Sequence, residues 1–414
     1  MEGQRSGASR RSVLGLMGAV PVAAAGAVMA GTGPASAESS RRARGPKAMR
    51  PGGEYDQYVA KQAGADKFSG TILVAYGGKP VLERAYGMAD KGKSIRNRTD
   101  TLFNLASIGK SFTATALLQL VEQGKVDLRE KLGTYLGGFP AAVAKTATVH
   151  QLLTHTSGVG RPPVRPPDPV EQAWDSVEEV WEGTLKAIRA QEPRFTPGTD
   201  WQYSNDGFTV LGAIVAEVSG QNYYDYVREH VFAPAGMERT DFYTRPEVLA
   251  ADDIAHNYAT PNKGEPFDFT TSDEFPFIGL PAGGCFSTAR ELLKFVMALR
   301  EDGKLLRHSF AELATSGKEP DVAPEEEPDP LLQCTHYGYG FATSIYNFQR
   351  IYGHTGGGKG VGDSYNVYPD LDCVSVILGN HGSAHSKPIV QLERRLVTEP
   401  SNSRSERVHV PAAS

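Results

Sequence analysis

The chain has 414 residues, of which 40% are hydrophobic, and its 43 basic and 48 acidic residues give a formal net charge of −5. This composition supports a large buried core and carries no broad basic signature, so it argues against a nucleic-acid-binding protein. Three cysteines, Cys285, Cys334 and Cys373, are too few and too widely spaced for a disulfide framework or a zinc site. We expect buried free thiols, with a Cys334–Cys373 bridge as the alternative.

The N-terminal segment predicts export. Arg10 and Arg11 precede a weakly apolar run over residues 16–29, and a small-x-small sequence ends at Ala37. This pattern is typical of a twin-arginine signal that spans residues 1–37 and is cleaved at its end. The run is shorter than the roughly 20 residues of a membrane-spanning helix, and an uncleaved anchor is the alternative. We therefore expect a secreted or extracytoplasmic protein without stable membrane insertion after signal removal.

Residues 55–400 have the organisation of one folded domain, between a basic flexible tail at 38–54 and a flexible C-terminus at 401–414. Strand-like segments occur near both ends of this domain, and segments of helical periodicity lie between them. Strands are predicted at residues 68–74, 80–86, 338–345, 350–354, 364–368 and 373–378, the first two joined as a hairpin at Gly77-Gly78. Helices are predicted at residues 107–124, 173–191, 207–219, 222–232, 287–301 and 388–397.

This order of elements predicts an α+β fold. One antiparallel sheet is expected to be assembled from the two ends of the domain, about residues 55–125 and 285–400. A largely helical part, about residues 126–284, is inserted between them. Two proline-bearing loops, at 161–169 and 318–330, are expected to be exposed and mobile.

The segment from Ser107 to Lys110 carries the first candidate chemistry. A serine hydroxyl must lose its proton to a nearby base as it attacks a carbonyl. Lys110 follows Ser107 by three residues, so both lie on nearly the same face of the predicted helix, whose N-terminus favours developing negative charge. We predict Ser107 as a nucleophile and Lys110 as its proton-transfer partner. A helix-capping role for Ser107 is the alternative.

A second polar segment, Tyr-Ser-Asn, supplies complementary groups. Tyr203 and Asn205 lie in a loop before the helix predicted at 207–219. A tyrosine beside an ammonium can trade protons with Ser107 and the leaving group, while Asn205 can hold a substrate amide or orient Lys110. An ordinary turn is the alternative interpretation.

The third segment, His354, Thr355, Gly356 and Gly357, follows a predicted strand. An edge strand beside the nucleophile can present a backbone N–H to an oxyanion, and the N–H groups of Ser107 and Gly357 are the candidates. His354 can supply positive charge or a hydrogen bond toward the substrate or its carboxylate, depending on pH. A structural histidine is the alternative.

Two other motifs point to different chemistry and are set aside. Residues 353–359 match G-x-x-x-x-G-K, but Gly360 stands where a phosphate-binding loop has Ser or Thr, and a turn and strand rather than a helix are predicted next. His155 could pair with a serine, but no G-x-S-x-G elbow accompanies it, so we interpret it as fixing a helix-ending turn. No ligand cluster in the sequence argues for a metal, and no cofactor is expected.

Together these ordered motifs resemble the serine β-lactamase and penicillin-binding protein superfamily, specifically the branch of class C β-lactamases, D-alanyl-D-alanine carboxypeptidases and related esterases. The likeness extends over about residues 68–380 and includes residues 152–158, 234–237 and 281–284. It implies a five-stranded antiparallel sheet flanked by helices beside an all-helical subdomain, with the site at their junction.

The resemblance also implies roles for the motif residues. Ser107 becomes the acylated nucleophile, Lys110 and Tyr203 its proton-transfer partners, and Asn205 a substrate contact. His354 stands in place of the usual lysine. A permanent ammonium would hold a β-lactam carboxylate well, so this replacement argues against efficient penicillin destruction.

The hypothesis from the sequence is an exported serine hydrolase that forms an acyl-enzyme on Ser107 and acts on an amide or ester, with a D-amino-acid peptide favoured, as in a D-Ala-D-Ala carboxypeptidase. An esterase, a β-lactamase and a peptide transacylase share these motifs and stay open. A penicillin-binding sensor without turnover is the alternative of another class. The expected partners are small peptide, ester or β-lactam substrates, and the oligomeric state is not predicted.

Overall fold

The computed structural model describes residues 45–161, 168–261, 265–320 and 329–399. The predicted export signal, the C-terminal tail and the middle of both proline-bearing loops lie outside these ranges. Over the described ranges, no helix combines the length and the apolar character that crossing a membrane requires.

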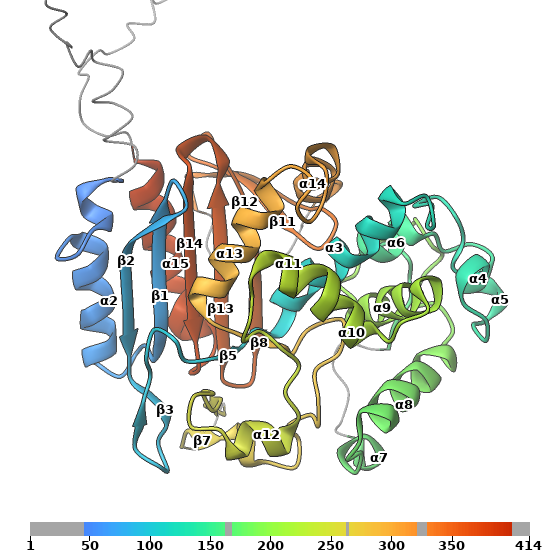
Figure 1. The fold of residues 1–414 in the computed structure, drawn as a ribbon, viewed down its shortest axis with the longest axis horizontal. Helices are drawn as coiled ribbons and strands as arrows, with labels where there is room; N and C mark the ends of the chain where they lie inside the picture. The colour runs from blue at the N-terminus through green and yellow to red at the C-terminus, as the bar shows by residue number, and fades with distance from the viewer. Residues whose placement is uncertain (1–44, 162–167, 262–264, 321–328, 400–414) are drawn as a thin grey trace, which may run out of the picture. The chain divides into compact units, whose positions relative to one another are not determined.

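The central element is one antiparallel sheet (Figure 1). Its strands are β1 (Gly70–Tyr76), β2 (Lys79–Tyr86), β9 (Glu319–Pro320), β10 (Leu332–Tyr337), β11 (Ala342–Tyr346), β12 (Gln349–Gly358), β13 (Val361–Tyr368) and β14 (Cys373–Gly379). In space the order is β2-β1-β14-β13-β12-β11-β10-β9. The predicted α+β class is confirmed, but within the described residues the sheet has eight strands instead of five, because β11, β10 and the short β9 extend it beyond β12.

The two ends of the chain meet in this sheet, as the sequence predicted. β1 pairs with β14 over its whole length, with Gly70 opposite Gly379. The hairpin between β1 and β2 turns at Gly77 and Gly78, whose φ angles of +58° and +69° suit the two central positions of a tight hairpin turn. The predicted hairpin is therefore confirmed at its predicted glycines.

One predicted strand begins later than expected. Residues 338–341 were expected to open the strand at 338–345, but they form a turn, and β11 begins only at Ala342. Gly340 has a φ of +73°, and a Cβ there would lie 2.7 Å from the Lys110 carbonyl oxygen. The chain turns here because its glycines let it dock closely on the helix that carries Lys110. β10, which pairs with β11, was not predicted at all.

Helices account for most of the remaining chain. The segments that were predicted as helices form α3, α8, α9, α10 with η3, α13 and α15. The helices α2 and α14 were not predicted. Their bounds are η1 (Lys47–Met49), α2 (Glu54–Gly64), η2 (Ala106–Ile108), α3 (Gly109–Glu122), α4 (Leu132–Tyr135), α5 (Ala141–Ala144), α6 (Val149–Leu153), α7 (Pro169–Gln172), α8 (Val177–Arg189), α9 (Asn205–Ser219), α10 (Tyr223–Val227), η3 (Arg228–Phe232), α11 (Ala233–Ala235), α12 (Arg245–Ala250), η4 (Phe269–Thr271), α13 (Ala289–Arg300), α14 (His308–Thr315), η5 (Pro369–Leu371) and α15 (Ser383–Thr398).

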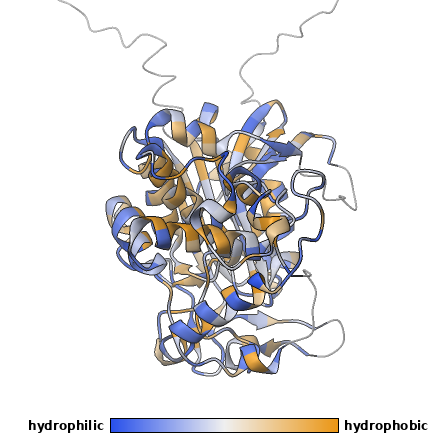
Figure 2. Ribbon diagram, turned by 90° about the vertical axis from the view of Figure 1, so that its right-hand side faces the viewer, coloured by the Kyte–Doolittle hydropathy of each residue, from blue (hydrophilic) through white to orange (hydrophobic). Residues whose placement is uncertain are grey.

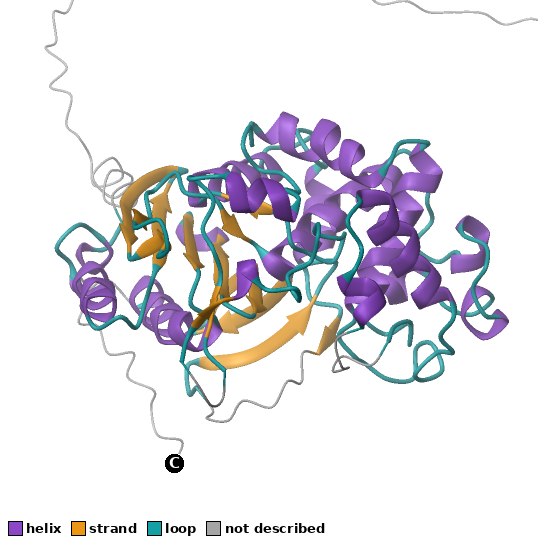
Figure 3. Cartoon of the chain, turned by 90° about the horizontal axis from the view of Figure 1, so that it is seen from below, coloured by secondary structure: helices purple, strands orange, loops and turns teal. Residues whose placement is uncertain are grey.

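Helices cover both faces of the sheet. α13 packs on β1 and β14 from one side, and α15, backed by α2, packs on β13 and β14 from the other. Consecutive residues of β1 therefore enter different cores: Leu73 joins the cluster that includes α13, and Ile72 joins the cluster around Ile389 of α15. Figure 3 shows the strands gathered on one side of the molecule and most helices on the other.

Short strand pairs stand outside the main sheet. They are β3 (Met88–Asp90) with β4 (Ile95–Arg96), β5 (Phe103–Asn104) with β8 (Phe286–Ser287), and β6 (Tyr258–Ala259) with β7 (Phe267–Asp268). The β5–β8 pair sets Phe103 opposite Ser287. It thereby brings the chain that enters η2 beside the loop that precedes α13.

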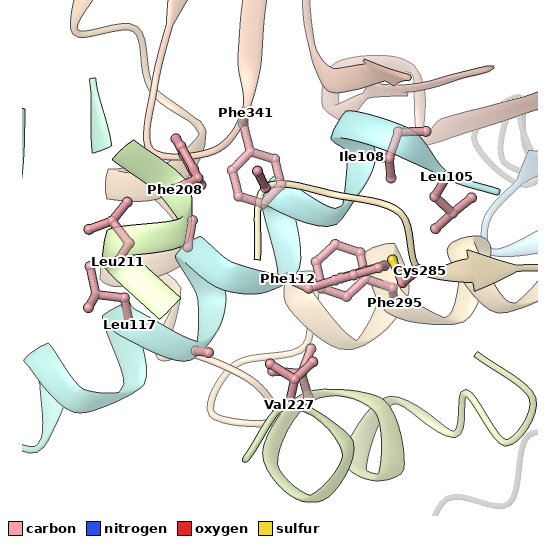
Figure 4. Packing of buried hydrophobic residues seen from close by; sticks show 14 of the residues in the cluster. Leu105, Ile108, Phe112, Leu117, Phe208, Leu211, Val227, Cys285, Phe295 and Phe341 are labelled. Carbon is pink, nitrogen blue, oxygen red and sulfur yellow. The ribbon is translucent and has the colours of Figure 1, made fainter. Parts of the chain in front are cut away.

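α3 is the helix around which the helical part is packed. Phe112 contacts Phe232 and Phe295 edge to face, with ring centroids 5.1 and 4.8 Å apart, and Figure 4 shows Phe112, Phe295 and Cys285 together in this core. Apolar residues gather along the central helices of this part, and polar ones along the outer loops (Figure 2). Residues 109–118 of α3 are all buried, so a polar side chain in its first turn is removed from water.

Candidate active site

The turn that carries Ser107 is η2, immediately before α3. Ala106 has a φ of +41°, which is uncommon for a residue with a Cβ. Its N–H donates to Asn104 Oδ1 at 2.9 Å, and its carbonyl accepts from the Gly284 N–H at 3.2 Å. A Cβ on Gly283 would lie 2.1 Å from that same carbonyl oxygen. The turn is thus held from both sides, and Gly283 lets the neighbouring loop approach it.

Lys110 lies one turn along α3 and is fully buried. Its Nζ is 3.1 Å from Ser107 Oγ, 2.7 Å from Asn205 Oδ1 and 2.7 Å from the Ala282 carbonyl oxygen. Burial lowers its pKa well below the usual value of a lysine. A neutral amine has two N–H bonds, which the two carbonyl-type oxygens accept, and one lone pair, which is left for the Ser107 hydroxyl.

The Tyr-Ser-Asn segment leads into α9. Ser204 caps this helix, since its Oγ accepts from the Gly207 N–H at 2.9 Å. Asn205, the first residue of α9, reaches Lys110 as described, which matches the predicted possibility that it orients the lysine. The ring of Tyr203 lies with its centroid 4.7 Å from Lys110 Nζ. The structure therefore brings Lys110 to Ser107, and it brings Asn205 and the ring of Tyr203 to Lys110.

The strand β12 supplies the fourth side of the site. β11 pairs with β12 only as far as Gly353, so residues 354–358 extend beyond it. Gly356 faces the turn of the nucleophile, and a Cβ there would lie 2.4 Å from the Leu105 carbonyl oxygen. Thr355 and Gly357 are exposed, and Gly357 lines the same cleft as Ser107. This juxtaposition fits the predicted pair of oxyanion donors.

His354 does not carry the positive charge that was one of its predicted roles. Its side chain is buried, its Nε2 accepts from the Tyr337 hydroxyl at 3.0 Å, and its Nδ1–H donates to the Thr355 carbonyl at 2.7 Å. Burial, followed by the proximity of Lys110, lowers the pKa of His354 to about 3. A charged role is disfavoured because the ring points into the protein, where both nitrogens are bonded and a charge would be desolvated.

A cleft of about 280 Å³ opens beside Ser107, Asn205 and Gly357. Its lining includes an apolar wall, part of which comes from the loop before α13. The main apolar side chains of this wall are Tyr243, Phe275, Pro276, Ile278, Leu280 and Phe286.

An ion pair borders the same cleft. Arg161 donates to both carboxylate oxygens of Asp206, from Nε at 2.9 Å and from Nη2 at 2.8 Å. Because Asp206 directly follows Asn205, this pair anchors the start of α9. The sequence did not predict it, since the two residues are 45 positions apart and no motif joins them. The carbonyl of Ala282 was missed for a similar reason, because a main-chain acceptor leaves no signal in residue identity.

The remaining sequence-based interpretations are also decided by the structure. Residues 353–358 belong to β12, so the G-x-x-x-x-G-K match has no phosphate-binding loop around it. All three cysteines are free thiols, with Cys285 and Cys373 buried. The histidine set aside above, His155, follows the end of α6 in a left-handed conformation, as a helix-ending turn requires. In the described ranges, no three His, Cys, Asp or Glu side chains are grouped as a metal site.

The chain is similar in sequence and fold to known proteins. The family model described as Beta-lactamase matches residues 55–398. PbpX of Bacillus subtilis (strain 168) is 32% identical over 256 residues, and the match spans 60% of this chain but only 59% of PbpX. A penicillin-binding protein from Bacillus halodurans has a TM-score of 0.66 at 29% identity, over 80% of this chain and 98% of the other. A D-stereospecific amidohydrolase from Streptomyces sp. has a TM-score of 0.62 at 25% identity, over 82% and 98%.

Proposed function

The chain belongs to the β-lactamase family of serine hydrolases, and we propose that it hydrolyses small amides or esters through an acyl-enzyme on Ser107, with D-amino-acid peptides as the favoured substrates. The observation that carries this proposal is the buried Lys110 amine, 3.1 Å from Ser107 Oγ, with its two other polar contacts made to carbonyl-type oxygens. A neutral amine in this position is a general base that needs no further activation.

The reaction follows from these contacts. Ser107 Oγ attacks the substrate carbonyl carbon as its proton passes to Lys110 Nζ, and the oxyanion is bound by the N–H groups of Ser107 and Gly357. The protonated amine, with Tyr203 beside it, returns a proton to the departing amine or alcohol as the carbonyl is restored. Water then attacks the acyl-enzyme by the same route, and the acid product and the free Ser107 hydroxyl are released.

The choice of substrate class rests on the relatives and on the cleft. The similar solved proteins include one named as penicillin-binding and one named as a D-stereospecific amidohydrolase, and the second name supports a D-configured substrate. The apolar wall formed by residues such as Ile278 and Leu280 suits a neutral acyl side chain. His354 is neutral and turned inward, so a lysine-like clamp for a β-lactam carboxylate is not expected from it.

The test compares the wild type with Ser107→Ala and with Ser219→Ala, a control serine at the far end of α9. Each protein is incubated with a fluorescent penicillin, with a D-alanyl-D-alanine peptide and with p-nitrophenyl esters, and its intact mass is followed over time. We expect adducts and turnover in the wild type and the control only. Covalent labelling that persists in Ser107→Ala would overturn the proposal.

The same experiment separates the remaining candidates. Release of D-alanine marks a carboxypeptidase, and rapid loss of the penicillin adduct with product release marks a β-lactamase. Cleavage of esters alone marks an esterase, and transfer of the acyl group to an added amine marks a transacylase. A stable adduct without turnover of any substrate would indicate a sensor instead of a hydrolase.

We also propose export through the twin-arginine route, on the basis of Arg10 and Arg11 in the N-terminal segment. Replacing both with lysine should leave the protein in the cytoplasm with its segment uncleaved, as followed by cell fractionation and mass spectrometry. Unchanged export of that variant would contradict the proposal.

A further inference from the structure

His155 is a buried residue in a strained backbone conformation. It follows Thr154 after α6, its φ is +63°, and only 1% of it is exposed. A left-handed conformation costs a residue with a Cβ on the order of 1 kcal/mol or more, and it persists only where surrounding contacts determine it. The contacts of His155 therefore indicate what this conformation achieves.

These contacts converge on three consecutive residues around Tyr203. The His155 carbonyl oxygen accepts from the Gln202 N–H at 2.9 Å, and His155 Nδ1 accepts from the Ser204 N–H at 3.0 Å. Between these two bonds, the imidazole lies against the phenol ring of Tyr203, with centroids 4.4 Å apart and planes inclined by 38°. The backbone is thus bonded on both sides of Tyr203, and its ring is packed from one face.

The imidazole is itself held by its surroundings. The rings of Tyr337 and Phe208 lie 4.5 and 5.2 Å from it, centroid to centroid. Burial lowers the pKa of His155 well below its usual value. A neutral ring that accepts at Nδ1 carries its proton on Nε2. The bond from the Ser204 amide therefore exists only in the neutral form that the site favours.

We propose that His155 is a positioning residue for catalysis, which holds the phenol of Tyr203 beside Lys110 by bonding the main chain on both sides of Tyr203 and packing against its ring. This inference rests on the proposed function, in which Tyr203 takes part in proton transfer to the leaving group. A helix-ending turn alone would be satisfied by Gly or Asn. The nitrogen acceptor and the aromatic ring are needed only because the segment with Tyr203 is docked there.

The test is a double-mutant cycle with Tyr203→Phe, which keeps the ring and removes the hydroxyl. His155→Phe retains an aromatic ring and loses the acceptor for the Ser204 amide. His155→Asn tolerates the left-handed turn and offers a carbonyl oxygen as acceptor. Each variant is assayed on the p-nitroanilide and the p-nitrophenyl ester of D-alanine, because an anilide leaving group needs a proton far more than nitrophenolate does.

We expect His155→Phe to lower kcat/KM for the anilide by about 100-fold, the scale of a misplacement of about 1 Å, and to lower it less for the ester. In the Tyr203→Phe background the same change should have no further effect, and His155→Asn, which keeps an acceptor but lacks the ring, should lose less activity than His155→Phe. If His155→Phe does not fold, as judged by urea unfolding, His155→Gly replaces it in the cycle, because glycine adopts the left-handed turn without strain.

An equal loss in both backgrounds, no loss, or wild-type anilide cleavage by Tyr203→Phe would overturn the inference. Those results leave the Ser107 acyl-enzyme intact. Activity that survives in Ser107→Ala would instead remove the proposed function, so the two failures are distinguishable.

Discussion

Replacing Asn205 with aspartate tests whether a neutral Lys110 drives the reaction. Asn205 Oδ1 lies 2.7 Å from Lys110 Nζ, so the variant places a carboxylate in direct contact with the amine. At this distance a unit charge pair is worth about 6 kcal/mol at an effective dielectric constant of about 20, and about 1.5 kcal/mol in bulk water. At about 1.4 kcal/mol per pKa unit, this corresponds to a rise of roughly one to four units in the pKa of Lys110.

Because Asn205 is an exposed residue, solvent screens the new charge, and we expect a rise in the middle of that range, about two units. Lys110 is a base only when it is neutral, so the acidic limb of the kcat/KM profile should move to higher pH by this amount. At neutral pH the activity should fall about 100-fold and should return as the pH is raised.

The assay is the pH dependence of p-nitrophenyl ester hydrolysis from about pH 5 to 10, with correction for spontaneous hydrolysis. Asn205→Ala is the matched control, because it removes the contact with Lys110 without adding charge, so its profile should lose height without the same alkaline shift. A profile for Asn205→Asp that stays in place, or moves to lower pH, would refute the assignment of Lys110 as the base.

Two further predictions concern the groups around the site. The pKa of His354 is about 3 in the folded protein and about 6.5 when unfolded, so its neutral form contributes stability above pH 6.5 that is lost as the pH falls toward 3. From pH 7 to 4.5 the urea-derived unfolding free energy should fall by roughly 2 to 3 kcal/mol more in the wild type than in His354→Gln. An equal fall in both proteins would contradict this. Gly283→Ala should lower kcat/KM by about 100-fold, since its Cβ would lie 2.1 Å from the Ala106 carbonyl oxygen, whereas Gly64→Ala in α2, where a Cβ meets no atom within 4 Å, should keep full activity. Ester hydrolysis by the purified variants checks both expectations. An active Gly283→Ala would show that the turn that carries Ser107 tolerates displacement.

Local patterns in the sequence were enough to predict the features that depend on near neighbours. The spacing of Ser107 and Lys110 indicated that they share a helix face, and the structure places their functional atoms 3.1 Å apart. The segments rich in Ile, Val, Leu and Tyr on either side of Gly77-Gly78 predicted the first hairpin for the same reason, because turn geometry is set by a few adjacent residues. The ordered motifs also predicted the family.

Prediction failed where an element depends on distant contacts. Residues 338–341 alternate glycine with aromatic residues and were predicted to open a strand, yet they turn because Gly340 docks on the main chain of Lys110. β10 was missed because it pairs with β11 at the end of the sheet away from the core strands, and its residues are mostly half-buried. A half-buried strand has only a weak pattern of alternation from which to predict it.

What the sequence determined by itself is the inventory of candidate reacting groups: Ser107 and Lys110 at a helix start, Tyr203 and Asn205 before a second helix, and a Thr-Gly-Gly segment after His354. Only the tertiary structure decided their states. Burial of α3 lowers the pKa of Lys110, whose hydrogen-bond partners come from 95 and 172 residues away. His354 is neutral because its ring turns inward to Tyr337. Protonation depends on desolvation and on through-space neighbours, and neither is encoded in the spacing of residues along the chain.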